Sequence, residues 1–242
     1  MKFLRILLIA TGLVVVWQAI VILTAAPYYI LPPPLRVVTA AVSNSASLFH
    51  HAVTTVIEIV AGLLIGTLLG AVSALVMIIS RSMKQWVLPV LVISQAVPVF
   101  ALAPLLVLWL GYGMASKIAM AVLIIFFPVT AAFYDGLRRI EPEWLELGRV
   151  MNATPLAVLR HIRMPGALPA FASGLRVATA VAPIGAVVGE WVGSSEGLGF
   201  YMLHANARMQ TDTMFAALLT LAIVALLLYY SVDWVMNKIV YW

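Results

Sequence analysis

The chain has 242 residues, of which 64% are hydrophobic and only 10% are charged, and its mean hydropathy is +1.10. A soluble globule of this length needs more polar surface than this composition supplies, so we predict a membrane protein. In a membrane protein, a net charge of +5 is more typical of basic cytoplasmic loops than of nucleic-acid binding. The lack of cysteine excludes disulfides, thiolate metal sites and a cysteine nucleophile.

Six segments are long and apolar enough to span a bilayer, which takes about 20 residues. They are approximately residues 6–25, 55–79, 87–110, 115–134, 171–192 and 213–236. Charged side chains in these segments lie near the ends, where they can reach the interface. An even number of spans places both termini on one side. We therefore predict an all-α membrane protein of about six transmembrane helices, forming a single domain over residues 1–242.

The first segment has a basic start and small residues near Ala25 and Ala26, as a cleaved signal peptide does. Its apolar run is longer than the about 7–15 residues usual in signal peptides. We favour an uncleaved anchor, because cleavage would leave five spans.

Gly62, Gly66 and Gly70 recur every four residues in the second segment and form a stripe that permits close helix approach. Packing inside the bundle is the favoured interpretation, and a dimer face is the alternative.

The third segment contains Pro89, Pro98 and Pro104, with Gln95 between the first two. Each proline frees a backbone carbonyl that needs a partner or a water-filled path. The segment is either a kinked helix packed on its neighbours or part of a transport path. In the second case, Gln95 and Pro98 are candidate path residues.

A polar insert of about residues 135–170 separates the fourth and fifth segments. Pro142 suits the first position of a helix, and Glu143 and Glu146 follow where the helix dipole favours negative charge. The insert therefore begins with a short helix near residue 142.

A second short helix is predicted from Thr154-Pro155, because a threonine N-cap followed by proline opens helices. Met164-Pro165 is expected to end it, since the residue before proline is pushed out of the helical region. The helix pair is either an amphipathic hairpin resting on lipid or on its own bundle, or a docking surface for another protein. In the second case Trp144 and Leu156 would be among its apolar anchors.

Lysine and arginine are distributed unevenly between the two sides. Of the 14 such residues, only Arg36, Lys117 and Arg208 fall on the side opposite the insert, and Arg176 lies inside the fifth segment. The positive-inside rule places both termini and the insert in the cytoplasm. Arg176 is expected to extend to the cytoplasmic head groups.

Glu190 and Trp191 stand near the outer end of the fifth segment. One interpretation is a carboxylate wetted by the head groups beside an interfacial tryptophan. The other is a gate in which Glu190 bonds polar groups of the following loop, around Ser194, Ser195 and Asn206, because an ionisable group at a span is costly unless it faces protein or water.

The insert resembles the cytoplasmic signature of ABC importer permeases, in which a Glu-Ala-Ala triplet, a later glycine and an Ile-x-Leu-Pro end form the helix that docks onto the ATPase. The matching residues here are Glu146, Leu147 and Gly148 at the triplet, Asn152 at the glycine, and Ile162, Arg163, Met164 and Pro165 at the end. Leu147, Asn152 and Met164 depart from the pattern. Asparagine tolerates a left-handed backbone, so the turn can survive, whereas Leu147 adds bulk where the family is small.

Three further stretches, "YYILPPPLRV", "LPVLVISQAVPVFALAPLLVLWLGYG" and "GEWVGSSEGLGFYMLHANARMQTD", are similar to the nitrate, sulfonate and taurine branch of these permeases. They are also similar to permeases of thiamine-precursor importers, which carry hydroxymethylpyrimidine. The resemblance implies a type I importer fold in the inner membrane, two permease copies, two docked ATPase subunits and an external substrate-binding protein. Riboflavin, sulfonate or taurine, and nitrate stay open as substrates.

The chain lacks the G-x-x-x-x-G-K-[ST] phosphate loop, and its glycine-rich residues 193–200 contain no lysine. We therefore expect a transport subunit with no cofactor of its own, and ATP and Mg bound by the partner ATPase. His50-His51 is interpreted as an outer-loop feature without a metal. A secondary transporter and an intramembrane enzyme are the alternatives, and they are disfavoured because charges cluster at span ends and no histidine lies in a span.

Overall fold

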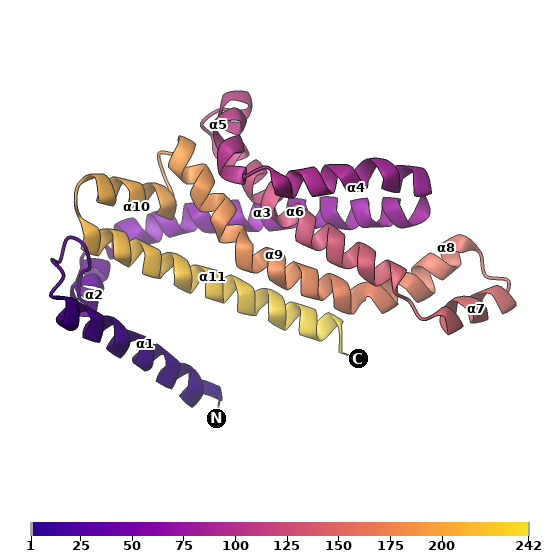
Figure 1. Ribbon diagram of the computed structural model, residues 1–242, viewed down its shortest axis with the longest axis horizontal. Helices are drawn as coiled ribbons and strands as arrows, with labels where there is room; N and C mark the ends of the chain where they lie inside the picture. Colours follow the sequence, from indigo (N-terminus) through magenta and orange to yellow (C-terminus); the bar gives the residue numbers. More distant parts are fainter. Residues whose placement is uncertain (1, 242) are drawn as a thin grey trace.

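The computed structural model describes residues 2–241, with side chains from Leu8 onward, and every regular element in this range is helical. The elements are α1 Lys2–Thr24, α2 Pro34–Ser43, α3 Ser45–Ile79, α4 Arg81–Ala96, α5 Val99–Leu110, α6 Met114–Arg138, α7 Pro142–Val150, α8 Pro155–Val158, the π-helix η1 Leu159–Arg163, α9 Met164–Gly193, α10 Leu198–Ala207 and α11 Thr211–Ile239 (Figure 1). The predicted all-α fold class is confirmed.

Four helical stretches are long and apolar enough to cross a membrane: α3, α6, α11 and the continuous run Pro155–Gly193 that ends with α9. They correspond to the predicted second, fourth, sixth and fifth spans. The bent pair α4 and α5 makes a fifth if it is taken as one span. The described part of α1, Leu8–Thr24, is a shorter apolar helix in the place of the predicted first span.

The third predicted span is broken rather than kinked. Helices α4 and α5 meet at an angle of 105°. Val97 between them is extended, and Pro98, the N-cap of α5, has no N–H with which to continue the ladder of α4. Pro89 and Pro104 stay inside their helices, so the tertiary setting decides which proline breaks the chain.

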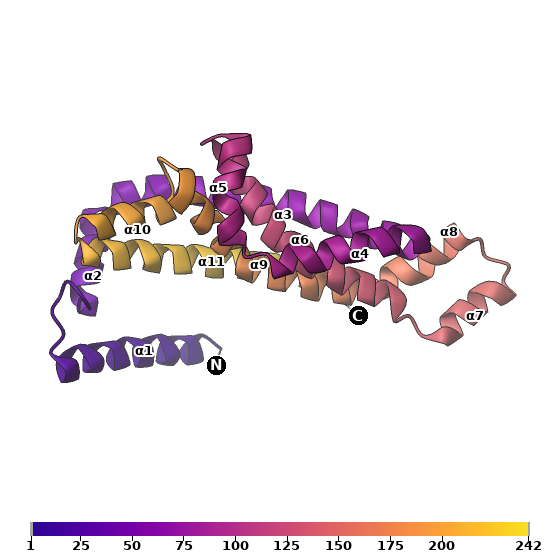
Figure 2. The same cartoon turned by 45° about the horizontal axis from the view of Figure 1, so that its top comes forward.

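The long helices run roughly along one axis. Helices α2 and α10 lie at one end, α7 and α8 at the other, and α5 projects sideways from near the middle (Figures 1 and 2). Helix α1 is set apart from the bundle, with Trp17 stacked on Phe215 of α11 at a centroid distance of 5.7 Å. The first residues of α1 and the last of α11 both point toward the α7–α8 end.

The glycine stripe packs inside the bundle, as favoured from the sequence. A Cβ added to Gly62 would lie 2.5 Å from the Cβ of Ala121, and one at Gly66 would lie 2.8 Å from Ile125 Cγ2, both on α6. Hydrogen in place of a side chain therefore lets α3 and α6 pack at close range. The α3, α6 and α9 helices together bury a core that includes Ile59, Ile125 and Ala182.

We expect Gly66→Leu to destabilise the bundle by about 1–3 kcal/mol, because overpacking forces the two helices apart. Gly12→Leu is the matched control, since nothing lies within 4 Å of a Cβ at Gly12. Thermal unfolding of both variants in the same detergent checks this prediction. Equal melting temperatures for Gly66→Leu and the unaltered protein would show that the stripe is not a packing surface.

Two boundary predictions were wrong, and two helices were not predicted. Helix α3 begins at Ser45, so His50 and His51 lie in a helix and not in a loop. The helix of the insert does not end at Met164-Pro165 but continues into α9. Helices α2 and α10 lie between the predicted spans, in stretches where the sequence predicted no helix.

Candidate functional sites at the two ends of the bundle

The first half of the insert folds as predicted. Helix α7 has Pro142 and Glu143 in its first turn, whereas Glu146 falls beyond that turn, contrary to the prediction. After it, Asn152 adopts a left-handed backbone with φ of 51°. The Ala153 N–H bonds Gly148 O at 2.9 Å and the Asn152 N–H bonds Arg149 O at 3.0 Å, which is the Schellman arrangement. The prediction that asparagine preserves the turn is confirmed.

The second half of the insert begins at the Thr154 N-cap, whose Oγ1 accepts the Ala157 N–H at 3.2 Å. The helix then widens into the π-turn η1 directly before Pro165. A wider turn gives the proline ring room beside the preceding carbonyls, which explains why the expected helix end at Met164-Pro165 is absent. Arg163 Nη1 donates to Leu137 O at 2.7 Å and so ties η1 to the last turn of α6.

We call residues 142–163 the hairpin. Gly148 is buried in it, because a Cβ at this position would lie 3.2 Å from Ile162 Cδ1 and 3.4 Å from Val158 Cγ2. Gly148 and Ile162 therefore pack against each other within the chain. The resemblance had placed Gly148 in the docking signature, but its burial here gives it a packing role inside the hairpin. Glu146 and Leu147 are exposed on the neighbouring turn, and Pro165 is half-buried at the base.

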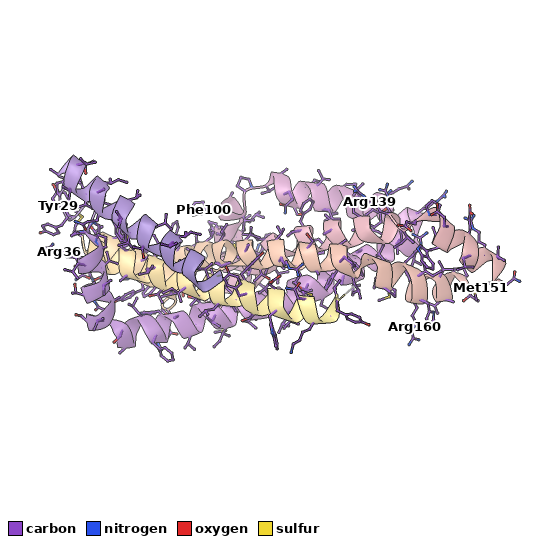
Figure 3. The ribbon with its side chains drawn as sticks, turned by 90° about the horizontal axis from the view of Figure 1, so that it is seen from below. Tyr29, Arg36, Phe100, Arg139, Met151 and Arg160 are labelled. Atoms are coloured by element: carbon purple, nitrogen blue, oxygen red, sulfur yellow. The ribbon has the colours of Figure 1, made fainter. Side chains whose placement is uncertain are left out.

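The hairpin carries apolar side chains on its outside. Val150 is 81% exposed and Leu156 71% exposed. Trp144 and Leu147 line a groove of about 670 Å³ that runs from the base of the hairpin toward Met151. Figure 3 shows Met151 at the far tip of the molecule, with Arg139 near the base and Arg160 on the second limb. The hairpin is thus a capped helix pair with an apolar outer surface.

The opposite end of the bundle holds a polar cluster around Glu190, which is 1% exposed. Glu190 Oε1 accepts the Thr55 hydroxyl at 2.6 Å, and Oε2 accepts the Gly199 N–H. The Thr55 oxygen in turn accepts the Leu198 N–H at 2.8 Å. A carboxylate at a helix N-terminus is favoured by the helix dipole, so Glu190 and Thr55 anchor the start of α10 onto α9 and α3.

Glu190 is therefore neither wetted by head groups nor bonded to the predicted loop groups. Ser194 instead forms hydrogen bonds with Glu196, and Asn206 is exposed on α10 with its carbonyl bonded to the Met209 N–H. Trp191 is 45% exposed beside it. Glu190 does lie near the end of its predicted span, at the end of α9 away from the hairpin, but its partners come from α3 and α10.

Sequence reasoning missed Thr55, Gly197 and Gly199. Gly197 has φ of 108°, and a Cβ there would overlap the Glu190 carboxylate, so only glycine fits. Apolar residues at 198, 202 and 205 are buried at helical spacing and would have indicated α10 as an amphipathic helix that starts after this glycine.

A buried ion pair lies next to this cluster. Lys117 Nζ of α6 is 3.9 Å from Glu58 Oε1 of α3, and both side chains are buried. Lys117 lies in the first turns of α6, within the predicted fourth segment. At the other end of the bundle Arg176 bonds Asp233 Oδ1 at 2.6 Å and Asn237 Oδ1 at 2.7 Å, so the expectation that it extends to head groups was wrong. These two cations are thus each paired with a carboxylate of another helix, as burial in a bilayer favours.

The predicted path residues Gln95 and Pro98 lie together at the α4–α5 break. Both are exposed, and both line a groove of about 440 Å³ whose other walls come from α6 and α9. The structure thus separates three places: the hairpin, the groove at the break, and the Glu190 cluster.

The family described as "Binding-protein-dependent transport system inner membrane component" matches residues 62–240, which span the core helices, the groove and the hairpin. The chain belongs to this family. It is thus a membrane permease subunit of an ABC importer.

Curated relatives support the same assignment for this permease. It is 56% identical over 240 residues, covering 99% of this chain and 98% of the relative, to the "Probable ABC transporter permease protein" of Haemophilus influenzae. It is 37% identical over 192 residues to the formylaminopyrimidine transport permease protein ThiX of Halalkalibacterium halodurans, covering 79% of this chain and 77% of ThiX. Against the riboflavin permease protein RibX of Chloroflexus aurantiacus the identity is 39% over 67% of this chain and 60% of RibX.

Solved structures share the fold of this permease. An amino acid ABC transporter matches with a TM-score of 0.66 at 15% identity, covering 84% of this chain and 96% of that one. The inward-facing MetNI methionine ABC transporter matches with a TM-score of 0.62 at 19% identity, covering 76% of this chain and 93% of that one. At these identities the comparisons concern fold alone.

Proposed function

We propose that the permease imports a thiamine-precursor pyrimidine, driven by ATP hydrolysis in a separate ATPase that docks on the hairpin. The substrate assignment rests on the 37% identity to a formylaminopyrimidine permease across 79% of the chain. The observation that carries the coupling is the capped hairpin, which projects from the end of the bundle with its apolar side chains uncovered. Riboflavin, sulfonate and taurine are the alternative substrates, because their permeases are also similar.

The hairpin is suited to transmit force. It is joined to α9 through η1 without a break, and Arg163 fastens it to α6. A partner that binds Leu147, Val150 and Met151 would move α6 and α9 together. The hairpin is attached to both helices, and these pack against each other in the core of the bundle. Aromatic and aliphatic side chains in a partner groove are the usual anchors of such contacts. Glu146, exposed beside them, is placed to meet a cationic group of the ATPase.

The complete transporter would contain two permease copies, two ATPase subunits with bound ATP and Mg, and a substrate-binding protein at the α2–α10 end. Transport would proceed by alternating access. Closure of the ATPase pair would tilt the helices through the two hairpins, and the outer end would open for substrate delivered by the binding protein. In this scheme, Glu190 holds α10 closed between cycles.

Orientation gives a direct prediction. Single cysteines at Ser82 and Thr154 are expected to resist a membrane-impermeant thiol reagent added to intact cells, whereas one at Ser47 is expected to react. All three positions are exposed, and the chain has no other cysteine, so labelling reports the side of the membrane alone. Permeabilised cells, in which all three react, serve as the control. Labelling of the Thr154 cysteine in intact cells would place the hairpin outside and refute the docking proposal.

Uptake by cells tests the substrate. A strain that depends on imported hydroxymethylpyrimidine for thiamine synthesis is expected to lose growth when this permease is deleted and to recover it with the intact gene. Uptake of labelled taurine and riboflavin in the same strains provides the comparison. Loss of taurine uptake with unchanged pyrimidine uptake would overturn the pyrimidine assignment and leave the permease assignment standing.

A further inference from the structure

The break between α4 and α5 exposes polar backbone at about half the length of the bundle. In Figure 3, Phe100, just past the break, lies between the hairpin end and the end marked by Tyr29 and Arg36. Helix α4 stops at Ala96, and the last carbonyls of a helix have no amide donors of their own helix. Pro98 supplies no N–H to replace them. Irregular backbone at membrane depth is tolerated where it lines a cavity, so the break marks such a place.

The groove beside the break has the size and walls of a small-molecule site. Its volume of about 440 Å³ falls within the roughly 300–1,000 Å³ usual for ligand pockets. Its apolar walls are Val97, Pro98, Val99, Ile124, Phe127, Pro128, Val177, Val181 and Ile184. Of the described side chains that line it, Ser94 and Gln95 are the polar ones. Ser94 donates to Leu91 O at 2.8 Å, which leaves its oxygen as an acceptor.

Gln95 is the distinctive group in this groove. Its side chain is exposed, and in the described part of the chain no hydrogen bond to it is found. A primary amide presents a carbonyl acceptor and an N–H donor side by side. That pair is complementary to the edge of a nitrogen heterocycle, where a ring nitrogen accepts and an adjacent amino group donates.

Among the residues whose side chains the structure describes, no charged one lines the groove. The cations nearest to the apolar interior are already paired, Lys117 with Glu58 and Arg176 with Asp233. A sulfonate or another permanent anion that left water here would meet no free cation, and burying an unpaired charge costs several kcal/mol or more. A neutral ring loses far less on entry.

We propose that this groove is a substrate-binding site for a neutral, planar nitrogen heterocycle. The Gln95 amide pairs with the hydrogen-bonding edge of the ring, while Phe127 and Val181 contact its faces. The site rests on the proposed import function and adds to it the place and the chemistry of recognition inside the permease. Specificity then arises in the permease as well as in the binding protein, because an anion is rejected by the lack of a cation.

Binding to the purified permease in lipid nanodiscs tests the site, with hydroxymethylpyrimidine as the probe and saturation-transfer NMR as the readout. Wild type is expected to give a saturable signal that excess taurine does not displace. Gln95→Leu is expected to weaken binding at least about tenfold, the loss that one unpaired amide contact produces. Gln85→Leu makes the same substitution at another exposed position of α4, away from the groove, and is expected to bind like wild type.

Each outcome decides the proposal. Absence of a saturable signal in wild type, displacement by taurine, or equal affinity in Gln95→Leu and Gln85→Leu would overturn it. Uptake by cells distinguishes this failure from failure of the proposed function. If wild type and Gln95→Leu import hydroxymethylpyrimidine equally well, the site is wrong while the function stands. If wild type imports none, the function itself is wrong.

Discussion

A Gly148→Trp permease is expected to reach the membrane at normal yield but to lose at least about 90% of ATP-driven uptake. The reason lies within the hairpin, because the position faces Ile162 Cδ1 at 3.2 Å and Val158 Cγ2 at 3.4 Å. An indole there wedges α7 away from η1, and overpacking of this kind costs about 1–3 kcal/mol, with each 1.4 kcal/mol equal to a factor of ten. Uptake by membrane vesicles and co-purification of the ATPase measure the two consequences.

Gly148→Ala is the matched control for this prediction. The atom that its Cβ would approach most closely is the end of a flexible isoleucine side chain, which can shift by a few tenths of an ångström. We expect Gly148→Ala to retain most uptake. If Gly148→Trp also transports normally and retains the ATPase, the hairpin is not the coupling element.

A Glu190→Ala permease is expected to hydrolyse ATP without the binding protein at least about fivefold faster than wild type and to import less substrate. Removing the carboxylate leaves the buried Gly199 N–H without its acceptor, at about 1–3 kcal/mol. It also breaks the bond from the Thr55 hydroxyl to α9, and that hydroxyl then donates to His51 O alone. The start of α10 is then no longer held to α9. The closed state of the outer end therefore loses part of its free-energy advantage over the open state. Hydrolysis and uptake in proteoliposomes that contain the partner ATPase measure both effects.

Glu190→Gln is expected to be mild. The amide oxygen can accept the Gly199 N–H, while its NH₂ donates to the Thr55 oxygen if that hydroxyl turns its proton to His51 O, 3.1 Å away. Unchanged hydrolysis and uptake in Glu190→Ala would show that the cluster is a structural cap without a part in the gate. Equal defects in both variants would show that negative charge, and not hydrogen bonding, matters at this position.

The sequence predicted the features that depend on local chemistry. Thr154 and Pro155 favour a helix start through local interactions, and Asn152 tolerates the left-handed turn. The hairpin could therefore be predicted from its own residues. The long apolar helices and the inward-facing glycine stripe follow equally from composition and spacing.

The features that depend on tertiary partners could not be predicted. Pro98 stands at a helix break while Pro89 and Pro104 stay inside their helices, so the presence of a proline alone does not locate the break. Pro165 was expected to stop a helix, but a single π-turn accommodates it. One partner of Glu190, Thr55, lies 135 residues away along the chain, and no local pattern encodes that pairing.

The most direct test of the account is uptake of hydroxymethylpyrimidine by proteoliposomes that hold the permease with its ATPase and binding protein. The account predicts uptake only when ATP and Mg are present on the hairpin side, and loss of that uptake when the ATPase is omitted. Uptake that needs no ATPase and follows an imposed proton or sodium gradient would contradict it, and would identify the chain as a secondary transporter.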